Sequence, residues 1–264
     1  MATVREKMLA IADAIRLRIG RPDLLTLDDM ANAITEVYGV GVEDGKISGI
    51  EIGKAETMTS WWNTVTIGGT RNAFEYMFQF WDFSYIGGLN CPYVLTPVYA
   101  GYMFRSAKGI TKITKSQVDF SKIAALNLTF NGCADLEEIE EVYIPTSANS
   151  SFNNCSKLKK ISRMVIKSDI NTTTAFGKGF SGCKALADIS IEGTIPNDVN
   201  FNDCPLTPKS MKSVINSLKD YSENNTLVYT VTFNNACWTA LEADSAAPDG
   251  GTWKAYVNSK GWNV

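Results

Sequence analysis

Hydrophobic residues recur through the middle of the chain at fixed distances from a phenylalanine. The phrase FNGCADLEEI begins at Phe130, FNNCSKLKKI at Phe152 and FSGCKALADI at Phe180. A related phrase, FRSAKGITKITK, begins at Phe104, and a shortened one, FNDCPL, begins at Phe201. Successive phrases begin about 20 to 30 residues apart, a period that is typical of repeat architectures. The pattern therefore predicts that one structural unit is repeated along the chain.

The copies share small or apolar residues at three further positions. The third position after the phenylalanine holds Ala107, Cys133, Cys155, Cys183 and Cys204. The sixth position holds Ile110, Leu136, Leu158 and Leu186. The ninth position holds Ile113, Ile139, Ile161 and Ile189. One copy cannot cover its own apolar face, so the copies must stack, which predicts an α/β solenoid over residues 101–206.

Charged residues between these positions alternate in sign from copy to copy. The eighth position holds Lys112, Glu138, Lys160 and Asp188, and the eleventh holds Lys115, Glu141, Arg163 and Ile191. Strands of adjacent copies would lie about 4.8 Å apart, which makes residues at the same position direct neighbours. We therefore favour a solvated face whose charges compensate one another over a charged binding patch.

Residues 1–40 have the pattern of two short amphipathic helices. Thr3 and Glu6 form a capping-box pattern, and Thr26 and Asp29 form a similar start signal. Apolar residues at helical spacing follow each start, from Val4 to Ile19 and from Leu27 to Val37. Two such helices leave apolar faces uncovered, so we expect this module to mediate attachment or self-association.

Residues 41–100 form a Gly-rich linker followed by an aromatic-rich segment. Aromatic residues in this density are typical of a core or of the layer that caps a solenoid. An exposed subset could instead stack on sugar rings, since these side chains combine an apolar face with a polar tip. The candidate ligand-binding residues are Trp61, Trp62 and Trp81.

The period ends after the last copy, and residues 207–264 predict a C-terminal α/β cap. The segment LTPKSMKSVINSLKDYS has Pro208 in its first turn and an apolar stripe at helical spacing. NTLVYTVTF has the β-branched and aromatic content of a strand, and CWTALEA and TWKAYVNSKGW have helical patterns. A solenoid needs such a cap to close its open end.

Composition limits which kinds of binding or catalytic site the chain can contain. The 264 residues carry a net charge of −3, which argues against a nucleic-acid surface, and they contain 0 histidines. No cysteine lies close to another in sequence, which disfavours a zinc site. We predict buried free thiols, with disulfides as the alternative, and we expect no catalytic, cofactor or metal-binding residues.

The sequence also bears on location. The first 20 residues carry charges throughout and lack the apolar stretch of a secretory signal, and no segment is apolar enough to cross a bilayer. We therefore expect neither export through a signal peptide nor membrane insertion.

The repeated phrase F-x-x-C-x-x-L resembles the BspA-like class of leucine-rich repeats. The segments IADAIRLRIGRPDLLTLDDMANAI, GGTRNAFEYMF and PVYAGYMFRSAKGITKI resemble those that lead into such repeats in structural proteins of phages and prophages from gut Firmicutes. CPLTPKSMKSVINSLKDYS and the terminal KGWNV resemble the closing cap of those proteins. The resemblance covers most of the chain and implies a non-enzymatic virion component of the tail tip, baseplate or a fibre.

Three functions remain open at this point. The first is a phage adhesin, assembled in the host cytoplasm, that joins other virion proteins or its own copies through residues 1–40 and contacts host cell-wall polysaccharide or a surface protein. The second is a bacterial surface or secreted adhesin with the same repeats. The third is an enzyme acting on cell-wall glycan, for which Glu137 and Glu141 are the carboxylates to consider.

Overall fold

The computed structural model describes residues 77–84, 88–89, 94–145, 148–167, 176, 179–224 and 229–264. These residues all belong to one compact unit, Gly69–Val264. The two helices expected in residues 1–40 lie outside the described residues, as do Trp61 and Trp62.

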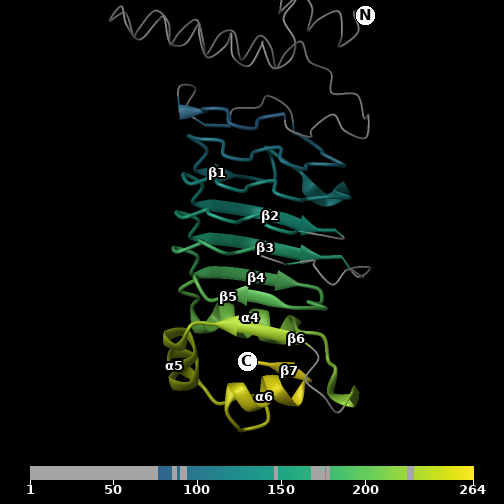
Figure 1. Cartoon of the computed structure of the whole chain (residues 1–264), viewed down its shortest axis with the longest axis vertical. Coiled ribbons are helices and arrows are strands. Elements are labelled where there is room, and N and C mark those ends of the chain that lie inside the picture. Colours follow the sequence, from purple (N-terminus) through teal and green to yellow (C-terminus); the bar gives the residue numbers. More distant parts are fainter. Residues whose placement is uncertain are drawn as a thin grey trace, which may run out of the picture. The chain divides into compact units, whose positions relative to one another are not determined.

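The described residues form a mixed α/β structure with two parallel sheets (Figure 1). The larger sheet contains four parallel strands in chain order. These are β1 (Lys112–Ile113), β2 (Glu138–Ile144), β3 (Lys160–Ile166) and β4 (Asp188–Glu192). Each strand comes from one copy of the repeated phrase, so the sequence period becomes the spacing between strands.

The isoleucines at the ninth position form one buried column. Ile113 is paired with Ile139, Ile139 with Ile161, and Ile161 with Ile189. All four side chains are at most 4% exposed. The residue before each isoleucine faces solvent because side chains alternate between the two faces of a strand. The predicted column is confirmed.

The phenylalanines form a second buried column. Their rings are stacked, with centroids 5.7 Å apart between Phe104 and Phe130 and 5.4 Å apart between Phe152 and Phe180. The column extends beyond the recognised phrases, to Phe78 at one end and Phe233 at the other. Phe78 thus marks a further copy that the sequence pattern did not reveal.

Phe104, Phe130 and Phe152 each lie between two residues with left-handed backbone conformation. Two positions before it, φ is positive at Tyr102, Leu128 and Ser150. Two positions after it, φ is positive at Phe80, Ser106, Gly132, Asn154 and Gly182. This conformation explains the Asn and Gly residues of the phrase, since these residues tolerate positive φ best.

Backbone hydrogen bonds join the copies at this turn. The N–H of Gly132 donates to the carbonyl of Asn153 at 2.8 Å, and the N–H of Asn154 donates to that of Ser181 at 2.8 Å. A Cβ on Gly182 would lie 2.5 Å from Oδ1 of Asn154, so a side chain there would have to displace the amide of Asn154. The turns are therefore stacked as regularly as the strands.

The smaller sheet and three α-helices form the C-terminal part, and all of these elements except the first strand lie within residues 207–264, for which an α/β cap was predicted. The sheet contains β5 (Val199–Phe201), β6 (Tyr229–Phe233) and β7 (Trp262–Asn263) in parallel. The helices are α4 (Pro208–Ser217), α5 (Asn235–Asp244) and α6 (Trp253–Ser259). Two short 3₁₀ helices are η2 (Phe120–Lys122) and η3 (Ser222–Asn224).

Helix α4 covers the free edge of β4 (Figure 1). It begins after Thr207, whose hydroxyl caps the first turn by accepting from the N–H of Ser210. The hydroxyl of Ser210 accepts from the N–H of Ile189 at 3.0 Å, and that of Ser213 accepts from the N–H of Ile191 at 2.8 Å. The serines thereby satisfy N–H groups that a fifth strand would otherwise pair.

The predicted column at the eleventh position of the phrase is wrong at its last member, Ile191. Glu141 is paired with Arg163, but Ile191 is paired with Met164 rather than with Arg163. The register shifts because two residues separate Ile161 from Met164 in β3, whereas one residue separates their partners in β4. Glu192 moves next to Arg163 as a result and supplies the opposite charge.

Candidate binding faces

The exposed side of the larger sheet carries a ladder of ion pairs. Nζ of Lys112 lies 3.0 Å from a carboxylate oxygen of Glu138, which is paired in the sheet with Lys160. Lys160 is in turn paired with Asp188. The predicted alternation of sign at the eighth position is confirmed.

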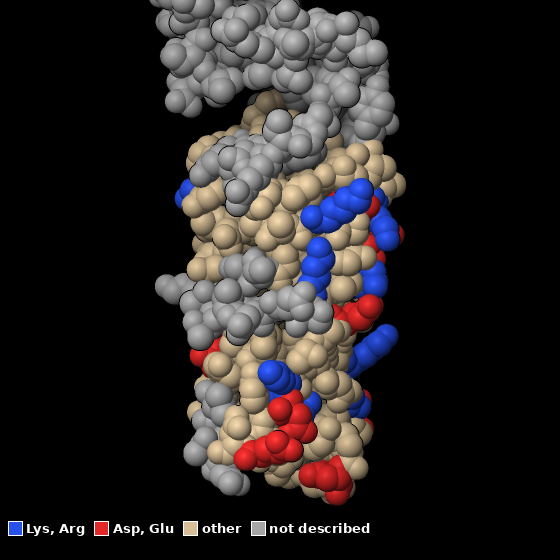
Figure 2. All heavy atoms as spheres, turned by 90° about the vertical axis from the view of Figure 1, so that its right-hand side faces the viewer, with Lys and Arg blue, Asp and Glu red and all other residues tan. Residues whose placement is uncertain are grey.

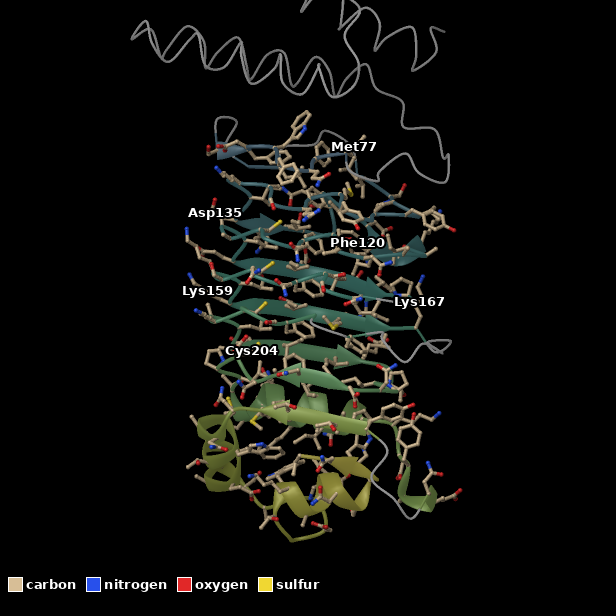
Figure 3. All side chains as sticks on the ribbon, viewed as in Figure 1. Met77, Phe120, Asp135, Lys159, Lys167 and Cys204 are labelled. Atoms are coloured by element: carbon tan, nitrogen blue, oxygen red, sulfur yellow. The ribbon has the colours of Figure 1, made fainter. Side chains whose placement is uncertain are left out.

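A second set of pairs lies at the end of the sheet where β2 and β3 begin (Figure 3). Lys157 is 2.8 Å from Asp135, and Lys159 is 2.7 Å from Glu137. Lys167 lies at the other end of these strands, where its ammonium donates to the carbonyl of Ile123 at 3.0 Å (Figure 3). The charges of this face are thus directed toward one another.

Glu141 is the most buried carboxylate of the ladder, with a side chain only 10% exposed. Burial raises its pKa, but hydrogen bonds from Lys115 and Arg163 outweigh burial, so the pKa lies below its ordinary value. The ammonium of Lys115 is 2.9 Å from one carboxylate oxygen, and Arg163 contacts the other. Glu141 is therefore ionised at neutral pH and fixed between two cations.

Arg163 connects three strands. Its guanidinium donates to Glu192 on β4, to Glu141 on β2 and to the hydroxyl of Tyr143. These bonds raise its pKa. In Figure 2, basic and acidic side chains alternate along one edge of the molecule, while much of the remaining visible surface is uncharged. Because its charges are paired, the sheet face is a poor site for a charged ligand.

The cysteines of the repeated phrase are free and buried. The thiol of Cys133 donates to the carbonyl of Phe104 at 2.8 Å, and that of Cys155 to the carbonyl of Phe130 at 3.0 Å. Burial raises the pKa of Cys133 and of Cys183 to about 12. These thiols stay protonated near neutral pH and are not nucleophiles.

The carboxylates considered for glycan hydrolysis are both ion-paired. Glu137 is held by Lys159, and Glu141 by Lys115 and Arg163. Burial of Glu141 is outweighed by its cationic partners, so its pKa is lowered rather than raised as a general acid requires. Within the described part of the chain, no group of three or more His, Cys, Asp or Glu residues is arranged to hold a metal ion.

Trp81 is the one candidate tryptophan within the described residues, and it lies in the first copy. Its position corresponds to the third position of the phrase, which Ala107 and Cys133 occupy in the next copies. The ring is half-buried and contacts Phe78 at 5.4 Å and Phe83 at 6.0 Å between centroids. Much of Trp81 is therefore packed against the layer of the stack that contains Phe78.

Phe80 is an exposed aromatic residue that the sequence pattern did not single out. Its side chain is 66% exposed, and its φ is +62°. The equivalent position in later copies holds Ser106, Gly132, Asn154 and Gly182. If the segment at Phe78 is aligned with the other copies, Phe80 is the one aromatic residue at this position.

The two positions after each stacked phenylalanine form a surface that we call the turn face. From Phe78 to Phe201 its members are Gln79, Phe80, Arg105, Ser106, Asn131, Gly132, Asn153, Asn154, Ser181, Gly182, Asn202 and Asp203. All are exposed or half-buried. The charged members are Arg105 in the second copy and Asp203 in the last. Between these two copies, the turn face consists of amides, a hydroxyl and glycines.

The chain was compared with protein-family models, curated proteins and solved structures. None of the three comparisons found a match. Among the described residues, no helix is both long and apolar enough to span a membrane.

Proposed function

We propose that this chain is a non-enzymatic structural protein of a phage particle, a component of the tail tip, baseplate or a fibre that contacts the host surface. Its middle part, in this proposal, is a leucine-rich-repeat solenoid of the BspA-like class. The observation that carries the proposal is the in-register stacking of the repeated phrase, with the phenylalanines in one column and the isoleucines in another.

The stacking supports a role as a rigid scaffold. Consecutive copies are joined by backbone hydrogen bonds both at the strands and at the turns. Helix α4 covers one end of the larger sheet, which limits edge-to-edge aggregation. A stack of this kind presents side chains at a regular spacing of about 4.8 Å, which suits an extended or repeating ligand.

The state of the reactive groups supports a non-enzymatic role. The thiols are buried with raised pKa values, and the carboxylates of the sheet face are directed at lysines and arginines. Paired groups of this kind stabilise a surface and leave little capacity for proton transfer.

In this proposal, residues 1–40 join the chain to other virion proteins or to its own copies. Their two apolar stripes, Val4 to Ile19 and Leu27 to Val37, need a partner surface. The solenoid and its cap then project toward the host.

The test is retention of the purified chain on isolated cell walls of the host. We expect retention that survives raised salt, because the charges of the sheet face are already paired and the net charge is small. Walls of an unrelated bacterium serve as the control. Equal retention on both walls, or on neither, would contradict a host-specific adhesin.

A further inference from the structure

Phe80 occupies a position that its backbone conformation and exposure both disfavour. A bulky residue with φ of +62° is an outlier, and the later copies place serine, glycine or asparagine there. The conformation is imposed by the stack, because the N–H of Phe80 donates to the carbonyl of Arg105 at 2.9 Å. Neither folding nor burial explains an aromatic side chain that remains 66% exposed at this position.

The surroundings of Phe80 are also unlike the rest of the turn face. In the next copy, the guanidinium of Arg105 lies over the ring of Tyr102, 5.5 Å from its centroid. Both residues are half-buried. The equivalent positions in later copies hold smaller side chains, such as Asn131 and Leu128. Among the turn-face residues, the large planar groups, Phe80 and Arg105, thus lie in the first two copies, and Tyr102 borders the face there.

The middle of the turn face has unused hydrogen-bonding capacity. The side-chain amides of Asn153 and Asn154 form no hydrogen bond with other described residues, although the backbone of each is bonded. Each amide offers donors and an acceptor. Backbone bonds between copies hold the turn-face residues of one copy about 4.8 Å from those of the next. A ligand along this surface would meet neutral polar groups at regular intervals.

We propose that the turn face binds an uncharged, hydroxyl-rich polysaccharide that lies along the stack, with one sugar ring on the exposed face of Phe80. The inference rests on the proposed function and assigns its ligand and its site. Stacking on an aromatic face suits the apolar side of a sugar ring, and the amides of Asn153 and Asn154 suit its hydroxyls. The sheet face is a weaker candidate, because its polar groups are engaged in ion pairs.

The decisive variant is Phe80→Asn. Asparagine is the residue that Asn154 shows to be compatible with this conformation, so the variant should unfold at the same temperature as the wild type or a higher one. Binding should fall about tenfold, which corresponds to the loss of one stacked ring. The probe is a set of purified neutral polysaccharides from the host wall, with affinity measured by biolayer interferometry.

Four further variants locate the site. Asn153→Ala should also weaken binding, whereas two controls should bind as the wild type does. The controls are Val98→Ala, which shortens another exposed apolar residue, and Glu138→Gln on the sheet face. A double variant, Trp61→Ala and Trp62→Ala, tests the other aromatic candidates. Full binding by Phe80→Asn, or loss confined to the tryptophan variant, would overturn the inference.

The outcomes separate this site from the wider proposal. If Phe80→Asn is retained on host walls as well as the wild type, the turn-face site is wrong and host attachment stands. If retention persists on walls stripped of polysaccharide, the partner is a protein and the inference fails. If the wild type binds neither intact nor stripped walls, the attachment function fails as well.

Discussion

At the level of single residues, the cysteine column combines small size with hydrogen-bond donation. Each thiol fits beneath the preceding turn and donates to a carbonyl of the copy before it, as Cys183 does to Phe152 at 3.0 Å. Ala107 fills the same position in an earlier copy, so from Phe104 onward the position holds a small side chain and does not depend on sulfur chemistry.

Buried thiols should resist modification in the folded protein. We expect Cys133, Cys155 and Cys183 to remain unalkylated by iodoacetamide at neutral pH, because burial raises their pKa values and excludes the reagent. Peptide mapping by mass spectrometry should show full alkylation after unfolding without a reductant. Cysteines that stay unmodified after unfolding would indicate disulfides and contradict the free-thiol assignment.

Glu141 should make the free energy of unfolding depend on pH in the acidic range. Replacement by glutamine removes a carboxylate that two cations hold, and should lower the free energy of unfolding by about 1 kcal/mol at neutral pH. Because its pKa is lower in the folded state, the contribution is complete above the unfolded pKa of about 4.3. It disappears as the pH falls through the folded pKa.

Urea denaturation of the wild type and Glu141→Gln across this range measures the effect. Glu137→Gln is the matched control, because Glu137 and its partner Lys159 are both exposed. This variant should change the free energy of unfolding by only about a few tenths of a kcal/mol. Equal losses in the two variants, or a difference that does not change with pH, would show that Glu141 has no special role.

At the level of secondary structure, the contact of α4 with β4 determines how the larger sheet ends. Ser210→Ala should lower stability by about 1 to 3 kcal/mol, because the N–H of Ile189 would be left buried without an acceptor. Asn216→Ala, at an exposed position on the same helix, should be neutral or slightly stabilising. Thermal unfolding distinguishes them, and similar behaviour would refute the capping role.

The sequence pattern predicted the elements that share a repeated phrase. Ile139 and Ile161 recur at one distance from a phenylalanine, and that distance fixes which residues pair across the sheet. The helix at Pro208 was equally visible, because a proline and an apolar stripe occur together.

Other elements depend on contacts that a linear pattern does not reveal. The shift that pairs Met164 with Ile191 arises from one residue fewer in β4, which alignment on the phenylalanine cannot show. The copy at Phe78 was missed because Trp81 replaces the small residue of the phrase. The density of aromatics likewise could not distinguish buried Phe78 from exposed Phe80.

At the level of the whole molecule, we expect the two ends of the chain to have different roles. Deletion of residues 1–40 should leave residues 101–264 folded, because the buried phenylalanine and isoleucine columns lie within the compact unit Gly69–Val264. The truncated chain should show an unchanged circular dichroism spectrum but fail to join the particle or its own copies. Normal incorporation of the truncated chain would place the attachment module elsewhere.

The location of the chain in phage particles is the most direct test of its proposed role as a virion protein. Particles purified from the host that carries the gene can be labelled with gold-conjugated antibodies against residues 101–264 and viewed by electron microscopy. We predict label at the tail end of intact particles. Unlabelled particles, with label instead on the surface of the bacterial cell, would contradict it and would identify the chain as a bacterial adhesin.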